Sequence, residues 1–211
     1  MMTSLYKTLL DIIFPQKELE RKISTLSKDV LSEKLHIQER SGIVSLFEYK
    51  DPLIKKMIWL LKYKGNAYVA ELFADSISEY LTEELSDDIL FSKVVVCVIV
   101  PLPLSKKRER ERGFNQMKLI TDTLQKTGDF SVDSQMLIRI KHTVPQTTLA
   151  RKEDRAKNVK DVFGVRGNID LTNTHVILID DVYTTGSTLQ EAQKTLTKAG
   201  AHKVSCITLA H

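Results

Sequence analysis

The chain has 211 residues, of which 42% are hydrophobic and 27% charged, and its 31 basic and 27 acidic side chains give a formal net charge of +4. This length can bury a sizeable core, but no stretch approaches the ~20 apolar residues that a membrane-spanning helix needs. The charge is modest and its signs are interleaved, so it does not by itself mark a nucleic-acid-binding protein.

Residues 1 to 42 are predicted to be an N-terminal extension. Tyr6 to Phe14 is apolar enough for a helix, but Lys7 and Asp11 interrupt it and no small-residue cleavage site follows, so we exclude a signal peptide. Residues 17 to 42 are polar with weak periodicity, which fits a connecting segment or a pair of short helices. The extension contains no cysteine, so we expect no zinc site in it.

The chain has two cysteines, Cys97 and Cys206, which lie more than a hundred positions apart inside predicted strands. A buried thiol behaves as a small apolar side chain. Two such cysteines do not form a disulfide framework, so their use predicts a reducing, cytoplasmic compartment.

A helical part is predicted at residues 51 to 85, after an edge strand at Val44 to Tyr49. Asp51 and Pro52 match the cap and first turn of a helix. The apolar residues that follow share one face, and a second set with the same spacing runs from Val69 to Leu81. Met57 and Trp59 are interpreted as core packing.

The core sheet domain is predicted at residues 94 to 211, with an α/β fold of a twisted, mostly parallel sheet flanked by helices. Its strands are expected at residues 94 to 100, 136 to 140, 162 to 165, 176 to 179 and 204 to 209. The prolines of Pro101-Leu102-Pro103 end the first strand in an irregular turn. One helix is predicted from the basic segment after Ser105 to Gly128, and another from Leu189 to Gly200.

The most informative stretch runs from Val176 to Thr188, where an apolar strand is followed by Asp180 and Asp181 and then by a hydroxyl-rich turn that opens a helix. Ligands of such units bind beyond the carboxyl end of the strand, where the free N–H groups of the helix favour an anion. Gly186 lets a phosphate approach the backbone, and the turn supplies hydroxyl donors from Thr184, Thr185, Ser187 and Thr188. The carboxylates suit sugar hydroxyls or magnesium. Alternatively, the acids end a strand and the threonines cap a helix.

This stretch resembles the phosphoribosyl-diphosphate (PRPP) signature of type I phosphoribosyltransferases, which has four apolar residues, two acids and, after a short gap, Thr-Gly-x-Thr. Val94 to Gln116, which includes Arg-Glu-Arg-Gly-Phe-Asn-Gln, is similar to a block of ComF-type proteins. Arg139 to Phe163 and Ser45 to Gly65 resemble two further parts of that family. The chain is identified as a ComF-type member of this superfamily over residues 43 to 211, without the four-cysteine zinc module with which such proteins commonly begin.

The resemblance implies a PRPP-binding protein that transfers a 5-phosphoribosyl group to an unknown acceptor and releases pyrophosphate, with Mg²⁺ bound to PRPP. Asp180 and Asp181 would contact the ribose and act in catalysis, and either could also bind the magnesium ion. Residues 184 to 188 would hold the 5′-phosphate. The pyrophosphate would lie at a loop of unusual peptide geometry and its neighbouring arginines, namely Pro101, Leu102, Pro103, Arg110 and Arg112.

The polar segment from His142 to Lys160 is unusually long for a loop without function. By resemblance it is a mobile lid over PRPP. Arg151 and Arg155 would act on the pyrophosphate as catalytic residues, and Thr143, Gln146 and Asn158 would fix the closed lid.

Three functional alternatives stay open at this point. The first is an active phosphoribosyltransferase, although Thr184 stands where hypoxanthine-guanine phosphoribosyltransferases have an acid that acts as base, which disfavours 6-oxopurines as acceptors. The second is a PRPP sensor without catalysis. The third is a competence protein that handles single-stranded DNA beside a helicase-like partner, through phosphate contacts but without an evident aromatic stacking platform. A homodimer is compatible with each alternative.

Overall fold

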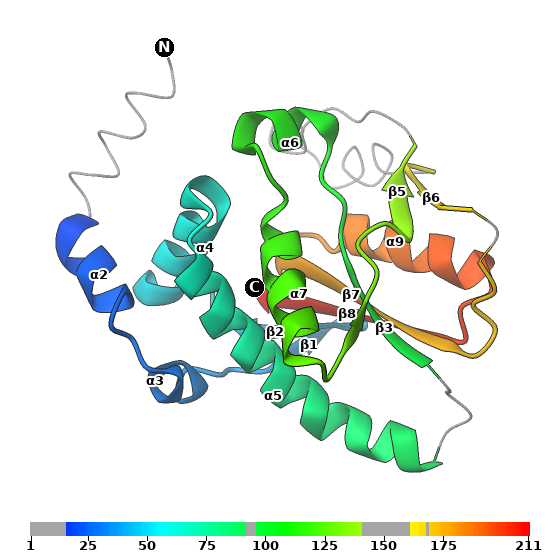
Figure 1. Ribbon diagram of the computed structural model, residues 1–211, viewed down its shortest axis with the longest axis horizontal. Helices are drawn as coiled ribbons and strands as arrows, with labels where there is room; N and C mark the ends of the chain where they lie inside the picture. Colours follow the sequence, from blue (N-terminus) through cyan, green and yellow to red (C-terminus); the bar gives the residue numbers. More distant parts are fainter. Residues whose placement is uncertain (1–15, 92–95, 141–160, 168) are drawn as a thin grey trace.

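The computed structural model describes residues 16–91, 96–140, 161–167 and 169–211. Its main sheet has six strands in the order β1-β2-β8-β7-β3-β4 (Figure 1). All neighbouring strands are parallel except β1, which runs antiparallel to β2. The strands are β1 (Gln38–Arg40), β2 (Ile43–Phe47), β3 (Val96–Pro101), β4 (Ser131–Val132), β7 (Thr174–Val182) and β8 (Lys203–Ala210). This confirms the predicted α/β class with a mostly parallel sheet.

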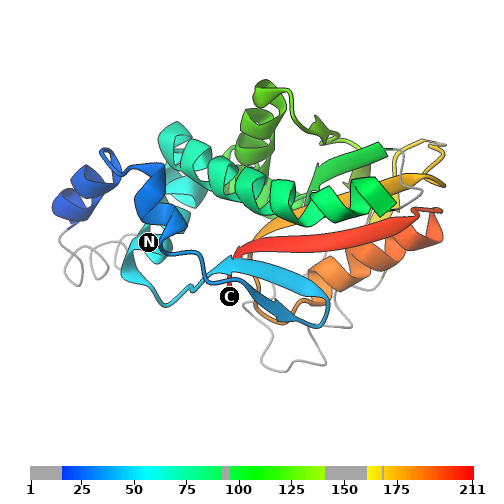
Figure 2. The same ribbon diagram turned by 90° about the horizontal axis from the view of Figure 1, so that it is seen from below.

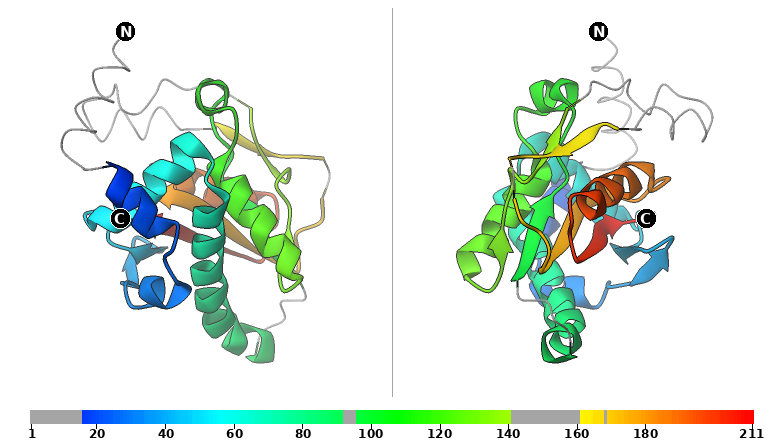
Figure 3. Two further views of the ribbon diagram at one scale, coloured as in Figure 1. Left: turned by 60° about the vertical axis from the view of Figure 1, so that its left-hand side comes forward. Right: turned by 90° about the vertical axis from the view of Figure 1, so that its right-hand side faces the viewer.

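Helices cover both faces of this sheet (Figures 2 and 3). The helices are α2 (Gln16–Ile23), α3 (Lys28–Ser32), α4 (Pro52–Lys64), α5 (Ala67–Phe91), α6 (Lys106–Arg112), α7 (Gln116–Thr127) and α9 (Ser187–Lys198). One face packs against α4, α5 and α7, and the other packs against α9. None of the helices in the described ranges has the length and apolar character needed to cross a bilayer.

The side chains of β7 alternate between these two layers, as in any strand. Ile177 and Ile179 belong to the cluster that includes α4, α5 and α7, whereas Val176 and Leu178 pack with the residues of α9. All four are fully buried, so each contributes roughly 1.5–3 kcal/mol of hydrophobic free energy. The alternation continues into the acids that follow Ile179, and it determines which layer each of them faces.

Several predicted elements are confirmed. The expected strands at residues 176–179 and 204–209 form the centres of β7 and β8, and the polar segment 17–42 does contain a pair of short helices, α2 and α3. The start of α4 is also as predicted, because the Oδ1 atom of Asp51 accepts hydrogen bonds from the N–H groups of Leu53 at 2.8 Å and Ile54 at 3.2 Å.

The position of β2 differs from the prediction of an edge strand. This strand lies inside the sheet, between β1 and β8, and the hydroxyls of Ser45 and Thr208 form a buried hydrogen bond of 2.7 Å across the β2–β8 pair. The sheet therefore includes strands before residue 94. A short apolar run predicts an extended segment, but its neighbours in a sheet are set by contacts distant in sequence.

The predicted strands at residues 136–140 and 162–165 are not part of the main sheet. They form β5 (Leu137–Arg139) and β6 (Phe163–Val165), which pair antiparallel with each other in a separate two-stranded sheet. The edge of the main sheet is occupied instead by the two-residue strand β4, which the sequence pattern did not predict. Runs this short carry too little periodicity to identify the sheet to which they belong.

The helix predicted from the basic segment to Gly128 is interrupted. Gly113 has a φ of +80°, a left-handed conformation that ends α6, and Asn115 then caps α7 by accepting a hydrogen bond from the N–H of Met117. This break turns the basic helix α6 away from α7, and α6 projects at the top of the view in Figure 1.

We predict that Asp51→Ala destabilises the protein by about 1 kcal/mol, because it removes the cap of α4, and that Asp51→Asn costs less. Burial alone would raise the pKa of Asp51, but the hydrogen bonds from Lys34, Ile54 and Leu53 outweigh it and lower the pKa from 3.8. The stabilisation by this charge is present above pH 3.8 and is lost as the pH falls through the lower folded-state pKa. Thermal unfolding at pH 7 and pH 3 measures both effects, and an unchanged Tm for Asp51→Ala at pH 7 would contradict the assignment.

Candidate functional site

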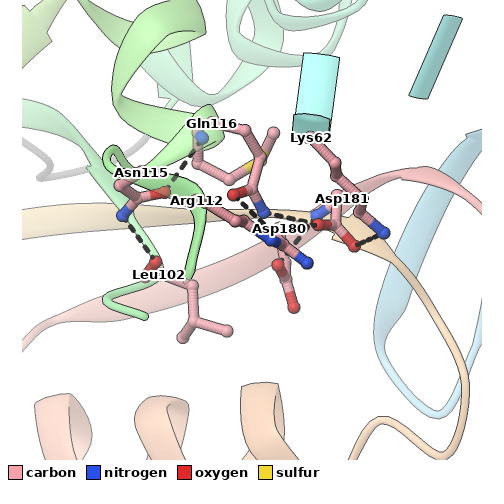
Figure 4. Close-up of polar contacts among 8 residues, drawn as sticks. Lys62, Leu102, Arg112, Asn115, Gln116, Asp180 and Asp181 are labelled. Atoms are coloured by element: carbon pink, nitrogen blue, oxygen red, sulfur yellow. Dashed lines mark hydrogen bonds and ion pairs between the residues drawn. The ribbon is translucent and has the colours of Figure 1, made fainter. Parts of the chain in front are cut away.

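Asp180 and Asp181 lie near the end of β7, at the carboxyl edge of the parallel sheet. Asp180 pairs in register with Thr208 of β8, and both Asp180 and Asp181 are half-buried. They are adjacent in a strand, so their side chains leave the sheet on opposite faces (Figure 4). Asp181 faces α4 and α7, and Asp180 points away from them.

Three side chains surround the carboxylate of Asp181 (Figure 4). The Nζ atom of Lys62 lies 2.9 Å from its Oδ1 atom, and the Nε2 atom of Gln116 donates a 2.5 Å hydrogen bond to its Oδ2 atom. Arg112 Nη1 is 3.9 Å from the same oxygen and donates to Gln116 Oε1 at 2.6 Å. Gln116 is fully buried, and its amide is fixed because both of its ends have partners. Asp181 is therefore held by α4, by the end of α6 and by the start of α7.

Lys62 and Gln116 were not among the predicted site residues. Both lie in the segments that carry the ComF resemblance, Gln116 as the last residue of Arg-Glu-Arg-Gly-Phe-Asn-Gln and Lys62 within Leu61-Lys-Tyr-Lys-Gly65. Their position in these family-like segments was the one sequence signal that could have marked them as site residues. No sequence pattern indicates that two segments so far apart meet at the same carboxylate.

Asp180 has a different electrostatic environment. Burial and the negative charge of Asp181 raise the pKa of Asp180 to about 7, although the N–H of Asp181 and the charges of Lys62 and Arg108 favour the ionised form. The N–H of Asp181 donates a 2.8 Å hydrogen bond to Asp180 Oδ1. Asp180 is thus a carboxyl group that titrates near neutral pH. Perturbed groups of this kind gather at functional sites.

Arg139 of β5 lies on the side of Asp180. Its Nε donates a 3.0 Å hydrogen bond to the carbonyl oxygen of Pro103, and its guanidinium carbon lies 4.9 Å from the centre of the Phe163 ring. Burial, together with the charge of Arg108, lowers the pKa of Arg139 to about 10 against the opposing effect of Asp180. The side chain therefore stays charged at neutral pH and fixes the loop after β3.

That loop contains the residues expected to receive pyrophosphate. Pro101 is the last residue of β3, and Leu102 is anchored through its N–H to Ile179 O at 2.9 Å and through its carbonyl oxygen to Asn115 Nδ2 at 3.1 Å. No cis peptide bond occurs in the described residues, so the unusual peptide geometry expected here does not take that form.

The two arginines predicted to bind pyrophosphate differ in placement. Arg112 points inward to Gln116 and Asp181, whereas Arg110 is exposed and its Nε donates to Lys106 O at 3.2 Å on the surface of α6. Arg108 acts electrostatically on Asp180 and was not chosen from the sequence. A two-residue spacing on a helix turns side chains to different sides, which separates Arg110 from Arg112.

The hydroxyl-rich turn leads into α9 as predicted. Gly186 precedes α9 with a φ of +71°, and the hydroxyls of Thr185 and Ser187 hydrogen-bond each other at 2.9 Å. A Cβ atom at Gly186 would lie 2.8 Å from the Tyr183 ring and 2.9 Å from Ile43 Cδ1. Only glycine fits this position without displacing its neighbours. The turn stands at the N-terminus of a twelve-residue helix, where an anion is favoured.

The residues predicted to form the lid lie outside the described residues. They are Thr143, Gln146, Arg151, Arg155 and Asn158.

Cys206 is unsuited to nucleophilic chemistry at this edge. Cys206 is buried in β8, and burial, together with the charge of Asp180, raises its pKa to about 12. Cys97 in β3 is half-buried. Within the part of the chain that the structure describes, no group of three His, Cys, Asp or Glu side chains could hold a metal ion.

Comparison with known proteins identifies the family of the chain. The family model for the phosphoribosyl transferase domain matches residues 105–211, which include α6, α7, β7 and the turn before α9. The chain is 32% identical to Competence protein ComFC of Bacillus subtilis (strain 168) over 166 residues, which are 78% of this chain and 62% of that protein. It is 31% identical to DNA utilization protein YhgH of Salmonella typhimurium over 163 residues, which are 77% of this chain and 68% of that protein.

The chain belongs to the phosphoribosyl transferase domain family, as a ComF-type protein. It also matches Competence protein F of Haemophilus influenzae, with 37% identity over 107 residues, 50% of this chain and 46% of that protein. A solved structure of adenine phosphoribosyl transferase from Trypanosoma brucei aligns with a TM-score of 0.42 and 15% identity, over 82% of this chain and 74% of that one. The chain thus spans less than two thirds of the length of ComFC and of Competence protein F.

We predict that Asp180→Asn stabilises this ComF-type protein at pH 8. The folded-state pKa of Asp180 is raised from 3.8 to about 7, so its ionisation costs free energy only in the folded state. The gain, roughly 1–3 kcal/mol, should be full at pH 8, should shrink as the pH falls below about 7, and should vanish below about pH 3, where both states carry the proton. Denaturant unfolding in the presence of EDTA measures it. A gain of equal size at pH 4 and pH 8 would exclude this explanation.

We also predict that Gly186→Ala is more harmful than Gly128→Ala. Both glycines have positive φ, +71° and +84°, but a Cβ at Gly128 would meet no atom within 4 Å. The control variant Gly128→Ala should lose about 1 kcal/mol of unfolding free energy through backbone strain. Gly186→Ala should lose at least about 1 kcal/mol more, because its Cβ atom would contact Tyr183 and Ile43. Thermal unfolding of the two variants provides the comparison, and equal losses would show that the turn has room for a side chain.

Proposed function

We propose that this ComF-type protein binds PRPP at the carboxyl edge of β7 and transfers its 5-phosphoribosyl group to an acceptor. The observation that carries the proposal is the meeting of opposite binding chemistries at one edge. Asp180 supplies hydrogen-bond acceptors, the turn before α9 supplies a helix N-terminus, and Arg108 and Arg139 supply positive charge. A sugar that carries both a phosphate and a diphosphate needs all three.

The chemistry follows from where charge develops. The bond between the anomeric carbon and the diphosphate oxygen breaks, a bond from the acceptor forms at the same carbon, and the acceptor loses a proton. The ribose carries positive charge in the transition state while the leaving group gains negative charge. Asp180 would orient the ribose hydroxyls and stabilise the positive ribose, and the loop 101–103 with its arginines would receive the pyrophosphate.

Magnesium fits this proposal as an ion that arrives with PRPP. The two acids point to opposite faces, so they do not form one chelating pair, and Asp180 is the acid of the motif that lies away from Lys62 and Gln116. Most ligands would come from the diphosphate and water, as magnesium prefers. When bound, the ion would offset the charge of the departing pyrophosphate.

The acceptor is proposed to be something other than a 6-oxopurine. Thr184 stands at the position where the resemblance to hypoxanthine-guanine phosphoribosyltransferases would call for an acidic base, and a threonine hydroxyl cannot take a proton at neutral pH. Another base, an amine or ammonia stays open, as does a role in sensing PRPP without transfer.

A second candidate function is binding of single-stranded DNA. Two relatives carry the names Competence protein ComFC and DNA utilization protein YhgH. Helix α6 has no buried residue, and three of its cationic side chains, Lys106, Lys107 and Arg110, are exposed. The structure also adds a feature that the sequence did not predict, because Trp59 and Tyr63 lie with ring centres 5.7 Å apart and Tyr63 is 60% exposed. The guanidinium carbon of Arg112 lies 5.8 Å from the centre of the Tyr63 ring, and an exposed aromatic ring next to a cation can stack on an unpaired base.

Calorimetry of PRPP with and without Mg²⁺ tests the primary proposal. We expect magnesium-dependent binding by the natural protein and a loss of at least a hundredfold in affinity for Asp180→Asn, about 3 kcal/mol, because the ribose hydroxyls lose a charged acceptor. The folded state of the variant is checked by its Tm. Absence of PRPP binding, combined with salt-sensitive binding of an oligothymidylate, would reject the first function in favour of the second.

A further inference from the structure

The two adjacent acids of the motif differ in the number of partners they already have. Both oxygens of Asp181 are engaged, Oδ1 by Lys62 and Oδ2 by Gln116, with Arg112 Nη1 3.9 Å from Oδ2. Its side chain is 13% exposed and that of Lys62 is 17% exposed. Because both oxygens are engaged and little of the side chain is exposed, Asp181 offers less free acceptor capacity to ribose hydroxyls than an unengaged carboxylate would. Asp180 lies on the other face of β7, and its Oδ1 atom accepts a hydrogen bond from the backbone N–H of Asp181.

We infer that the two acids have separate roles: Asp180 faces the ligand, whereas Asp181 is a positioning residue that ties α4, through Lys62, to the carboxyl end of β7. This inference rests on the proposed PRPP site and assigns different tasks to two residues that the motif treats alike. It adds Lys62, which lies more than a hundred residues before Asp181, to the parts on which that site depends.

Helix α4 is suited to be held in this way because a second ion pair fixes it nearer to its start. Lys56 is only 7% exposed, its Nζ atom lies 2.8 Å from Glu20 Oε1 of α2, and it also lies 4.4 Å from the centre of the Trp59 ring. One lysine thus links α4 to the N-terminal helix, and the other links it to the sheet edge. The exposed ring of Tyr63 lies 5.8 Å from the guanidinium carbon of Arg112, so this aromatic side chain of α4 is also near the site.

The burial of both charges indicates that loss of either partner of the ion pair between Lys62 and Asp181 would destabilise the protein. A carboxylate and an ammonium that are both largely buried lose hydration, and removing either one leaves the other charge without its partner. Gln116 cannot substitute for Lys62, because its Nε2 already donates to the other oxygen and its Oε1 accepts from Arg112. The loss of Lys62 should therefore be felt at Asp181, at the end of β7 and in the position of α4.

A double-mutant cycle in thermal stability tests the tie. Lys62→Met and Asp181→Asn should each lower Tm by about 3–8 °C, and the double variant should lose no more than the worse single variant. Lys118→Met is the matched control, since its partner Asp122 forms an exposed pair on α7 and its loss should shift Tm by less than about 2 °C. Additive losses, or an unchanged Tm for Lys62→Met, would overturn the inference.

PRPP binding in the presence of Mg²⁺ tests the division of roles. We expect Asp181→Asn and Lys62→Met each to weaken binding about tenfold, the double variant to match them, and Lys62→Arg to stay within about threefold of the natural protein. Asp180→Asn should weaken binding at least hundredfold without a loss of Tm. If Asp181 were itself a ribose ligand for which Lys62 competes, Lys62→Met would tighten binding, and that result would overturn the inference.

The two tests keep this inference separate from the proposed function. If the natural protein does not bind PRPP, the proposed function fails. The double-mutant cycle in Tm then tests the link between Lys62 and Asp181 by itself. Non-additive losses of Tm support the link, and additive losses reject it.

Discussion

Strand β7 carries the constraint on which both the core and the candidate site depend. It is hydrogen-bonded to β3 on one side and to β8 on the other along most of its length. Ile177, for example, is paired with Ile99 of β3 and with Ser205 of β8. Its apolar residues are buried in both layers, so a shift by one residue would move each of them into the layer packed for its neighbour. The same register fixes Asp180 and Asp181 on opposite faces at the edge where ligands of parallel sheets bind.

Charge at that edge is balanced by side chains from several distant segments. Lys62 comes from α4, Arg108 and Arg112 from α6, Gln116 from α7 and Arg139 from the small β5–β6 sheet. Lys62 and Gln116 contact Asp181, and Arg139 donates to the carbonyl of Pro103. Arg108 acts on Asp180 through its charge. Carboxyl groups in a partly buried position need such compensation, and their ionisation then depends on the folded arrangement. Two consequences of this partial burial are the raised pKa of Asp180 and the set of partners that surrounds Asp181.

The family relationship and the geometry support each other at different levels. The phosphoribosyl transferase domain match covers the part of the chain with the acids and the turn before α9, and the ComF-type relatives extend over the N-terminal helical layer as well. That layer contributes Lys62 and the exposed ring of Tyr63, neither of which lies within the matched domain. A function proposed from the domain alone would therefore omit the helix that closes the site on one side.

The sequence by itself determined the elements whose signals are local. The cap at Asp51, the buried runs of β7 and β8, and the glycine turn before α9 could all be predicted because each depends on neighbouring residues and on strong, short-range preferences. The motif from Val176 to Thr188 likewise identified the family. Tertiary structure alone decided that β2 is an inner strand and that the runs at residues 137–139 and 163–165 form their own sheet, since pairing partners are chosen by contacts across the whole chain. It also decided that Lys62 and Gln116 meet at Asp181 while Asp180 faces the other side, because electrostatic and hydrogen-bond partners are set by folding and not by distance along the sequence.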